Sequence, residues 1–142
     1  MPQITIETVV SQARTAQAQF ETASQEVVDE LIVGLAWAIL EPETNRSLAE
    51  QAVFETGLGN VEDKMIKNHR KTLGLLRDLK NAVSCGIIKE LPEQGLVEIA
   101  RPVGVVGAVT PSTNPIATPL NKTLNALKGR NSIILAPSPK GE

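Results

Sequence analysis

The chain carries a polar turn, Thr110 to Pro115, directly after an apolar run, Val103 to Val109. Because the run has no polar alternation, we expect a strand buried on both faces, as in the interior of a parallel sheet. A helix follows to about Lys128-Gly129, and the residues from Asn131 to Leu135 have the composition of a second strand. In a strand–helix–strand unit this turn lies at the carboxyl edge of the sheet, where α/β proteins bind ligands.

The start of the helix after the turn could bind an anion. Asn114 has the residue type of an N-cap and Pro115 that of a first helical position, so unpaired backbone N–H groups would face the crevice, where a pyrophosphate could bind. The same residues are equally typical of a capped turn without a ligand. Gly104 and Gly107 do not form G-x-G-x-x-G after a strand, so the standard dinucleotide fingerprint is absent.

The lone thiol, Cys85, and the lone imidazole, His69, are the other groups that could do chemistry. A catalytic thiol needs a lowered pKa and a base within reach, and the spacing of these two residues supplies neither. We interpret Cys85 as a small buried hydrophobe and His69 as part of a solvated helix face. A single cysteine cannot form an internal disulfide or a multi-cysteine zinc site, so we expect no bound metal.

Composition excludes several classes of protein. The 142 residues are 42% hydrophobic and 21% charged, which is typical of a globular domain. The net charge is −2, the basic residues are scattered and only 2% of side chains are aromatic, so nucleic acid is not an expected partner. The longest apolar stretch, Leu31 to Leu40, is too short to span a bilayer. We therefore expect no membrane partner and a cytoplasmic location.

Helices are expected to fill the first half of the chain. Apolar residues recur every three or four positions from Ile6 to Phe20 and from Val27 to Leu40. Thr22 and Gln25 have the spacing of a capping box before the second of these helices, which we expect to be the most buried. In the later helix that follows the polar turn, Leu120, Leu124 and Leu127 are expected to face the sheet.

Two further helices and a hairpin complete the expected elements. The third helix is expected to open at Asn45 or Ser47 and to end at Gly57, and Asn60 to cap a fourth helix of about five turns. The fourth helix is predicted to be amphipathic, with the apolar residues Val61, Met65, Ile66, Leu73, Leu76 and Leu79. Short β-type runs at Cys85–Lys89 and Leu96–Ile99 then predict a hairpin or a loop between strands.

Four strings of residues, taken together, resemble one known family. They are Glu55–Lys64 with Lys67-Asn68-His69, Arg101–Gly107, Thr110–Pro115 and Lys128–Ile134. They resemble the amino-terminal part of the aldehyde dehydrogenase superfamily, most closely its coenzyme A-acylating branch, and the first string is specific to that branch. The resemblance covers essentially the whole chain. It implies an α/β fold with a helical segment over 1–82, short β-strands over 83–101, and over 102–142 the first βαβ unit of a Rossmann-like NAD-binding domain.

The resemblance implies a reaction that uses NAD or NADP as cofactor and coenzyme A as co-substrate. A cysteine thiolate adds to a small-molecule aldehyde, hydride passes to NAD(P)+, and the thioester is transferred to coenzyme A. In the family that cysteine lies far downstream in a separate domain, and Cys85 does not match its motif. We therefore expect this chain alone to be inactive, and the full-length enzyme to form a homo-oligomer. The alternative is a truncated, non-catalytic interaction or nucleotide-binding module of the same fold.

The same resemblance implies roles for residues at the sheet edge. Asn114 would be the catalytic oxyanion donor, although an ungapped match to non-acylating relatives places their asparagine at Thr113. The residues Thr110, Pro111, Ser112, Thr113 and Ser138 would contact the cofactor. Ala136 and Pro139 replace the lysine and glutamate that bind ribose in relatives, so recognition of the ribose must differ here.

Overall fold

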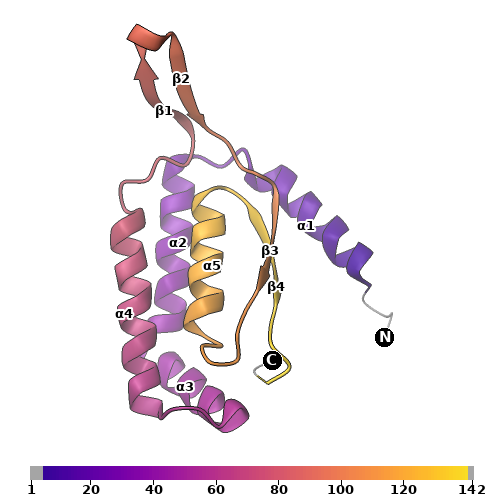
Figure 1. The fold of residues 1–142 in the computed structure, drawn as a ribbon, viewed down its shortest axis with the longest axis vertical. Coiled ribbons are helices and arrows are strands. Elements are labelled where there is room, and N and C mark those ends of the chain that lie inside the picture. The colour runs from indigo at the N-terminus through magenta and orange to yellow at the C-terminus, as the bar shows by residue number, and fades with distance from the viewer. Residues whose placement is uncertain (1–4, 141–142) are drawn as a thin grey trace.

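A computed structural model describes residues 5–140 of the chain, as a helical part, a projecting hairpin and a strand–helix–strand unit (Figure 1). The helical part comprises α1 (Ile6–Phe20), α2 (Gln25–Leu40), α3 (Pro42–Thr56) and α4 (Val61–Leu79). The hairpin comprises β1 (Gly86–Leu91), a 3-10 turn (Pro92–Gln94) and β2 (Leu96–Ala100). The last unit comprises β3 (Val105–Val109), α5 (Ala117–Lys128) and β4 (Ser132–Ala136). The predicted order of helices and strands is confirmed.

Two of the predicted helix starts were wrong, because a better cap lies nearby. Ser24, not Thr22, caps α2, and its hydroxyl accepts a hydrogen bond from the Val27 N–H at 3.3 Å. Helix α3 begins at Pro42 rather than at Asn45 or Ser47. The Glu41 carboxylate accepts from the Thr44 N–H at 2.8 Å, and proline suits the first helical position because it has no N–H to leave unpaired.

The predicted end of α3 and start of α4 are confirmed. Gly57 ends α3 in the left-handed conformation, with φ of 65°, which glycine adopts without steric cost. Three residues later Asn60 caps α4, and its side-chain oxygen accepts from the Asp63 N–H at 2.8 Å. The exposed turn between these two residues therefore joins the carboxyl end of α3 to the amino end of α4.

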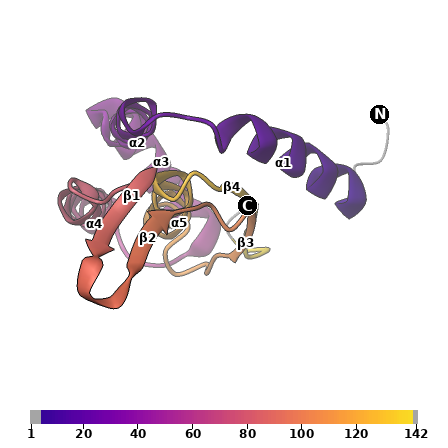
Figure 2. The same ribbon diagram turned by 90° about the horizontal axis from the view of Figure 1, so that it is seen from above.

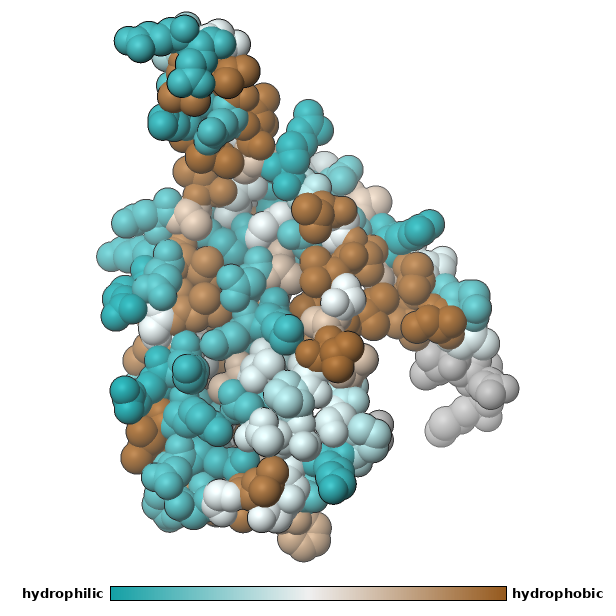
Figure 3. Space-filling view, viewed as in Figure 1, coloured by the Kyte–Doolittle hydropathy of each residue, from teal (hydrophilic) through white to brown (hydrophobic). Residues whose placement is uncertain are grey.

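Strands β3 and β4 pair in parallel, from Val105 opposite Ser132 to Val109 opposite Ala136, and α5 connects them. This confirms the βαβ unit. The prediction that both faces of β3 are buried was wrong, since Val109 is 79% exposed. The sheet has two strands in the described part of the chain, so one face at this end of β3 lacks a covering layer. Figure 3 shows apolar side chains on the hairpin and over the region of α1 and β3.

The core lies between helices rather than between helix and sheet. Leu120 and Leu124 of α5 cluster with Ile32 and Ala36 of α2, and the partly buried Leu35, Ile39, Leu75, Leu76, Leu79 and Leu127 pack around them. The prediction that the α5 leucines face the sheet was therefore wrong, because α2 and α4 cover that side of α5 (Figure 2). Helix α5, not α2, is the more completely buried, with five of its 12 residues buried against four of 16 in α2.

The buried face of α4 is polar over its first three turns. Lys64, Asn68 and Thr72 are buried, whereas Ile66 and Leu73, which we expected on the apolar face, are exposed. The Asn68 amide donates to the side-chain oxygen of Asn45 at 2.9 Å, which joins α4 to α3. Residues three or four apart lie on the same helix face. The buried face of α4 is therefore polar at Lys64, Asn68 and Thr72 and becomes apolar in the last turns, where Leu75, Leu76 and Leu79 pack against the core cluster.

Asparagine 131 connects three segments at the start of β4. Its side-chain oxygen accepts from the N–H groups of Val103 and Gly104 at 2.7 and 3.0 Å, and its amide donates to the Ala126 carbonyl at 3.2 Å. A Cβ on Gly129 would lie 2.7 Å from that amide nitrogen, so the close approach requires glycine. Asn131 thereby ties the entry into β3 to the end of α5.

Gln17 ties α1 to the same region. Its amide donates to the Arg130 carbonyl at 2.9 Å, and its oxygen accepts from the Ser132 N–H at 2.5 Å. Gln17 is buried although its neighbours on α1 are mostly exposed. Gln17 thus satisfies two backbone groups at the beginning of β4, and the Ser132 hydroxyl adds a hydrogen bond to the Ala13 carbonyl of α1 at 2.9 Å.

A partly buried ion pair joins α2 to the end of α5. The Lys128 ammonium is buried and donates to the Asp29 carboxylate, which also accepts from Gln25 at 3.0 and 3.1 Å. Burial raises the pKa of Asp29, but the hydrogen bonds from Lys128 and Gln25 and the Lys128 charge outweigh it and hold that pKa below its ordinary value. The folded state therefore favours the ionised carboxylate.

Asp29→Asn should lower the free energy of unfolding by about 1–3 kcal/mol, because Lys128 stays buried without an anion. Urea unfolding at pH 7 measures the loss. A lowered folded pKa means that the Asp29 contribution is complete above about pH 4 and disappears as the pH falls through the folded value. The difference between wild type and variant should shrink in that acidic range. A difference that is independent of pH would contradict an electrostatic origin.

Candidate functional site

The loops after β3 and β4 leave the sheet at one edge. The Thr110 N–H donates to the Ala136 carbonyl at 3.0 Å, which extends the parallel pairing to the last residues of both strands. Thr110 is buried directly after β3, whereas Ser138 is half-buried after β4, where its hydroxyl accepts from the Lys140 N–H at 3.4 Å. The structure therefore places the turn from Thr110 to Pro115 and the loop holding Ser138 at the same edge.

Asn114 does not cap the following helix. Helix α5 begins at Ala117, and its N-cap position, Ile116, makes no side-chain capping bond. The prediction of Asn114 as N-cap and Pro115 as first helical residue was therefore wrong. Pro119 has no N–H, so it fits within the first turn of a helix that begins at Ala117. The half-buried Asn114 amide bonds to no residue among 5–140, which leaves its N–H groups available.

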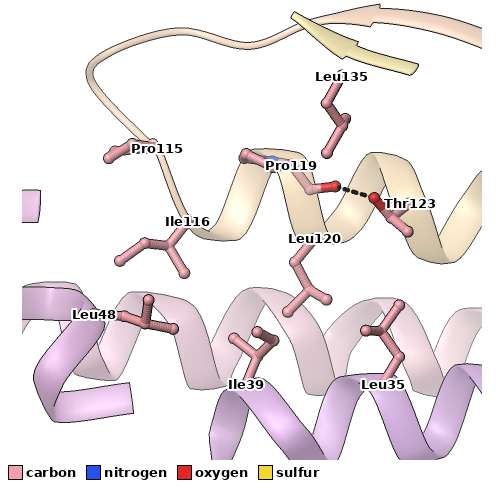
Figure 4. A pocket seen from close by; sticks show the side chains of 9 residues that line it. All are labelled: Leu35, Ile39, Leu48, Pro115, Ile116, Pro119, Leu120, Thr123 and Leu135. Atoms are coloured by element: carbon pink, nitrogen blue, oxygen red, sulfur yellow. Dashed lines mark hydrogen bonds between the residues drawn. The ribbon is translucent and has the colours of Figure 1, made fainter. Parts of the chain in front are cut away.

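An apolar pocket of about 270 Å³ adjoins this turn, between α2 and the start of α5 (Figure 4). Its lining consists of Leu35, Ile39, Leu48, Pro115, Ile116, Pro119, Leu120, Thr123 and Leu135. The single hydroxyl in the lining, that of Thr123, already donates to the Pro119 carbonyl at 2.9 Å. The pocket therefore offers mainly packing contacts beneath the turn, and none of its lining side chains has a free hydroxyl or charge for a charged ligand.

Cys85 and His69 do not join the sheet edge. Cys85 is half-buried just before β1, and His69 lies exposed on α4, as predicted for a solvated helix face. Within residues 5–140 there is no group of three or more His, Cys, Asp or Glu side chains that could hold a metal ion. None of the helices over the same range is both long and apolar enough to cross a membrane.

The parallel strands, the connecting helix and the polar turn at the carboxyl edge define an α/β unit preceded by helices. The chain belongs to the aldehyde dehydrogenase family, whose model matches residues 2–142. Within that family it belongs to the coenzyme A-acylating branch, and it matches the amino-terminal part of such enzymes. The resemblance seen in the four strings is thereby confirmed.

One relative is the acylating sulfoacetaldehyde dehydrogenase of Cupriavidus necator, 62% identical over 134 residues. The match covers 94% of this chain and 27% of that protein. An acetylating aldehyde dehydrogenase from Geobacillus thermoglucosidasius has a similar structure, with a TM-score of 0.90, 38% identity, and coverage of 95% of this chain and 29% of that one. The chain thus spans less than a third of the length of these relatives.

Two similar structures contain a bound cofactor or a coenzyme A thioester. The propionaldehyde dehydrogenase of Rhodopseudomonas palustris with bound propionyl-CoA matches with a TM-score of 0.80 and 29% identity, over 96% of this chain and 29% of that one. An engineered glycolyl-CoA reductase with bound NADP+ matches with a TM-score of 0.80 and 28% identity, over 96% and 30%. Homologous structures therefore bind both NADP+ and coenzyme A derivatives.

Sequence reasoning missed the buried charged residues. Hydrophobic periodicity treats lysine as a surface residue, so neither Lys64 nor Lys128 was expected inside. The available signal was spacing, because Lys64, Asn68 and Thr72 follow one another at intervals of four and lead into Leu75 and Leu79.

Proposed function

We propose that this chain is the amino-terminal part of an NAD(P)-dependent, coenzyme A-acylating aldehyde dehydrogenase that acts on sulfoacetaldehyde or a closely similar small aldehyde. In the balanced reaction, aldehyde, coenzyme A and NAD(P)+ give acyl-CoA, NAD(P)H and a proton. The 62% identity to the Cupriavidus necator enzyme carries this proposal. The nucleophilic cysteine, the nicotinamide contacts and the homo-oligomer contacts would come from the rest of such an enzyme.

Within this part, Asn114 is proposed as the donor to the oxyanion that forms when a thiolate attacks the aldehyde. Its position supports the role, because the amide lies half-buried at the sheet edge and has no other partner in residues 5–140. An oxyanion hole requires N–H groups aimed at the place where negative charge develops. Asn114 would then be a binding group for the transition state rather than a structural cap.

The residues proposed to contact NAD(P) are Thr110, Pro111, Ser112, Thr113 and Ser138. The donor set fits a nucleotide, since the hydroxyls of Ser112 and Thr113 bond to no residue among 5–140 and Ser138 retains its donor proton. When bound, NAD(P)+ accepts the hydride from the aldehyde carbon. The chain's own contribution is to hold the nucleotide at the edge where Asn114 lies.

The purified 142-residue chain should form no NADH from sulfoacetaldehyde, coenzyme A and NAD+. A chimera in which residues 1–142 replace the matching segment of the Cupriavidus necator enzyme should form it. Absorbance at 340 nm measures both reactions. A well-folded, inactive chimera would instead favour the non-catalytic nucleotide-binding or interaction module.

Cys85→Ser should leave the activity of that chimera within about twofold of the unsubstituted form, because Cys85 lies outside the sheet edge and does not match the nucleophile's motif. The same absorbance assay measures it, with circular dichroism as the control for folding. If the 142-residue chain turns over substrate and Cys85→Ser abolishes that turnover, Cys85 would belong to the active site and this assignment would be wrong.

A further inference from the structure

Helices α2 and α4 share an outer face that no other element covers within residues 5–140. The two helices lie side by side and antiparallel, at the side of the molecule away from the free end of α1 (Figures 1 and 2). A groove of about 420 Å³ separates them, and its lining consists of Asp29, Ile32, Val33, Leu76, Arg77 and Lys80. The middle of α2 is therefore level with the last turns of α4.

The α2 side of this face is acidic and apolar. Glu26, Glu30, Val33 and Trp37 follow one another at intervals of three and four, so they form one stripe along the helix. All four side chains are exposed, and the tryptophan is 66% exposed. Neither glutamate forms a salt bridge with any residue among 5–140. Large aromatic side chains with this exposure are typical of the centre of a protein interface.

The α4 side of the face is basic and apolar. Ile66, Arg70, Leu73 and Arg77 repeat the same spacing, and all four side chains are exposed. Arg70 forms no salt bridge in the described part of the chain, and Arg77 pairs with its exposed neighbour Asp78 at 2.9 Å, a contact that contributes little to stability. The face therefore carries negative charge along α2 and positive charge along α4, with apolar side chains within both stripes.

This face is complementary to itself about a two-fold axis parallel to the groove. A half turn about that axis places α2 of one copy over α4 of the other, antiparallel and at the same height. Glu30 then faces Arg77 of the second copy, and Trp37 faces Arg70 of the second copy, where a guanidinium can stack on the indole. Because the arrangement is symmetric, each of these contacts occurs twice.

We propose that the outer face of α2 and α4 binds a second copy of this chain in a two-fold symmetric dimer. Charge complementarity selects this partner and this orientation, because the glutamates of α2 meet arginines only when α2 lies over α4. An axis perpendicular to the helices would instead bring like charges together, which is unfavourable. The contact is independent of dehydrogenase chemistry, and it would be additional to the oligomer contacts that the rest of a longer enzyme would provide.

The test is sedimentation velocity of the 142-residue chain over a range of concentrations. We expect a monomer–dimer equilibrium whose Kd rises about tenfold or more between about 0.05 M and about 0.5 M sodium chloride, because salt screens exposed ion pairs. A chain that stays monomeric up to about 0.5 mM at the lower salt concentration would overturn the proposal.

Exchanging the charges locates the contact. Glu30→Arg and Arg77→Glu should each raise the Kd about tenfold or more, because like charges then face each other in both symmetry-related contacts. An equimolar mixture of the two variants should associate within about threefold of the unsubstituted chain, since every charge again faces its opposite. Both side chains are exposed, so circular dichroism should show unchanged folding. A mixture that associates no better than either variant alone would refute the two-fold arrangement.

Apolar substitutions distinguish this face from other exposed apolar surfaces. Trp37→Gln should raise the Kd about tenfold or more, because it removes the largest side chain of the face. Phe54→Gln is the matched control, since Phe54 is 90% exposed on α3 and lies outside the face, and it should change the Kd by less than about twofold. Leu96→Gln, on the projecting hairpin, should have an equally small effect. A dimer that is lost in Leu96→Gln and kept in Trp37→Gln would place the contact on the hairpin and contradict the proposal.

Discussion

Asn114→Asp in the active chimera is expected to lower turnover by roughly 10²–10³, the loss typical of removing one oxyanion donor. The substitution replaces the N–H2 group with an acceptor-only carboxylate, which would also repel the developing oxyanion. Folding should be unaffected, because the Asn114 amide makes no hydrogen bond to residues 5–140 and α5 begins three residues later. Steady-state kinetics should show the loss mainly in kcat rather than in KM.

A matched substitution separates this effect from a general effect of charge. Asn125→Asp introduces the same carboxylate on the exposed side of α5, where the Asn125 amide donates to the Asn121 carbonyl at 2.8 Å. Its kcat should remain within about threefold of the unsubstituted chimera. Near-normal turnover in Asn114→Asp would move the donor to Thr113 or to a backbone N–H of the turn.

Asn131→Ala is expected to lower the free energy of unfolding by about 2–4 kcal/mol. The substitution removes three hydrogen bonds and leaves the N–H groups of Val103 and Gly104 without their acceptor in a partly buried region. The entry into β3 would lose its connection to the end of α5. Urea unfolding followed by circular dichroism measures the change, which should appear in the midpoint and not in the slope.

Asn81→Ala is the control for the Asn131 substitution, because Asn81 is exposed in the turn after α4. It should change the free energy of unfolding by less than about 0.5 kcal/mol. A loss of similar size in both variants would mean that replacing any asparagine weakens this chain. The three contacts of Asn131 would then not account for its effect.

The pattern of apolar and polar residues predicted a helix or strand well where a single hydrophobic periodicity dominated the segment. The apolar run at Val103–Val109, the polar turn and the strand after Asn131 were enough to predict the parallel unit. Helix starts were less predictable, because Thr22 and Ser24 are both good caps and only tertiary packing selects between them. Burial of β3 depends on how many layers cover the sheet, which no local pattern encodes.

The candidate site was predictable in position but not in detail. In a βαβ unit the two strands are parallel, so the loops after β3 and β4 lie at the same edge of the sheet independently of their side chains. The start of α5 was misplaced, since both Pro115 and Pro119 suit the first turn of a helix. The buried Lys64 was missed because its burial depends on α3 packing against α4, a contact between separate helices.

The contact of Gln17 with the start of β4 has a consequence for synthesis. Gln17 and Ser132 are separated by 115 residues in the sequence. At about 5–20 residues per second, a ribosome needs roughly 6–23 s to extend the chain from Gln17 to Ser132. During that interval α1 lacks its contacts with β4, and its apolar residues Val9, Val10 and Phe20 are less completely covered. Helix α1 is therefore translated well before the strand to which Gln17 binds it.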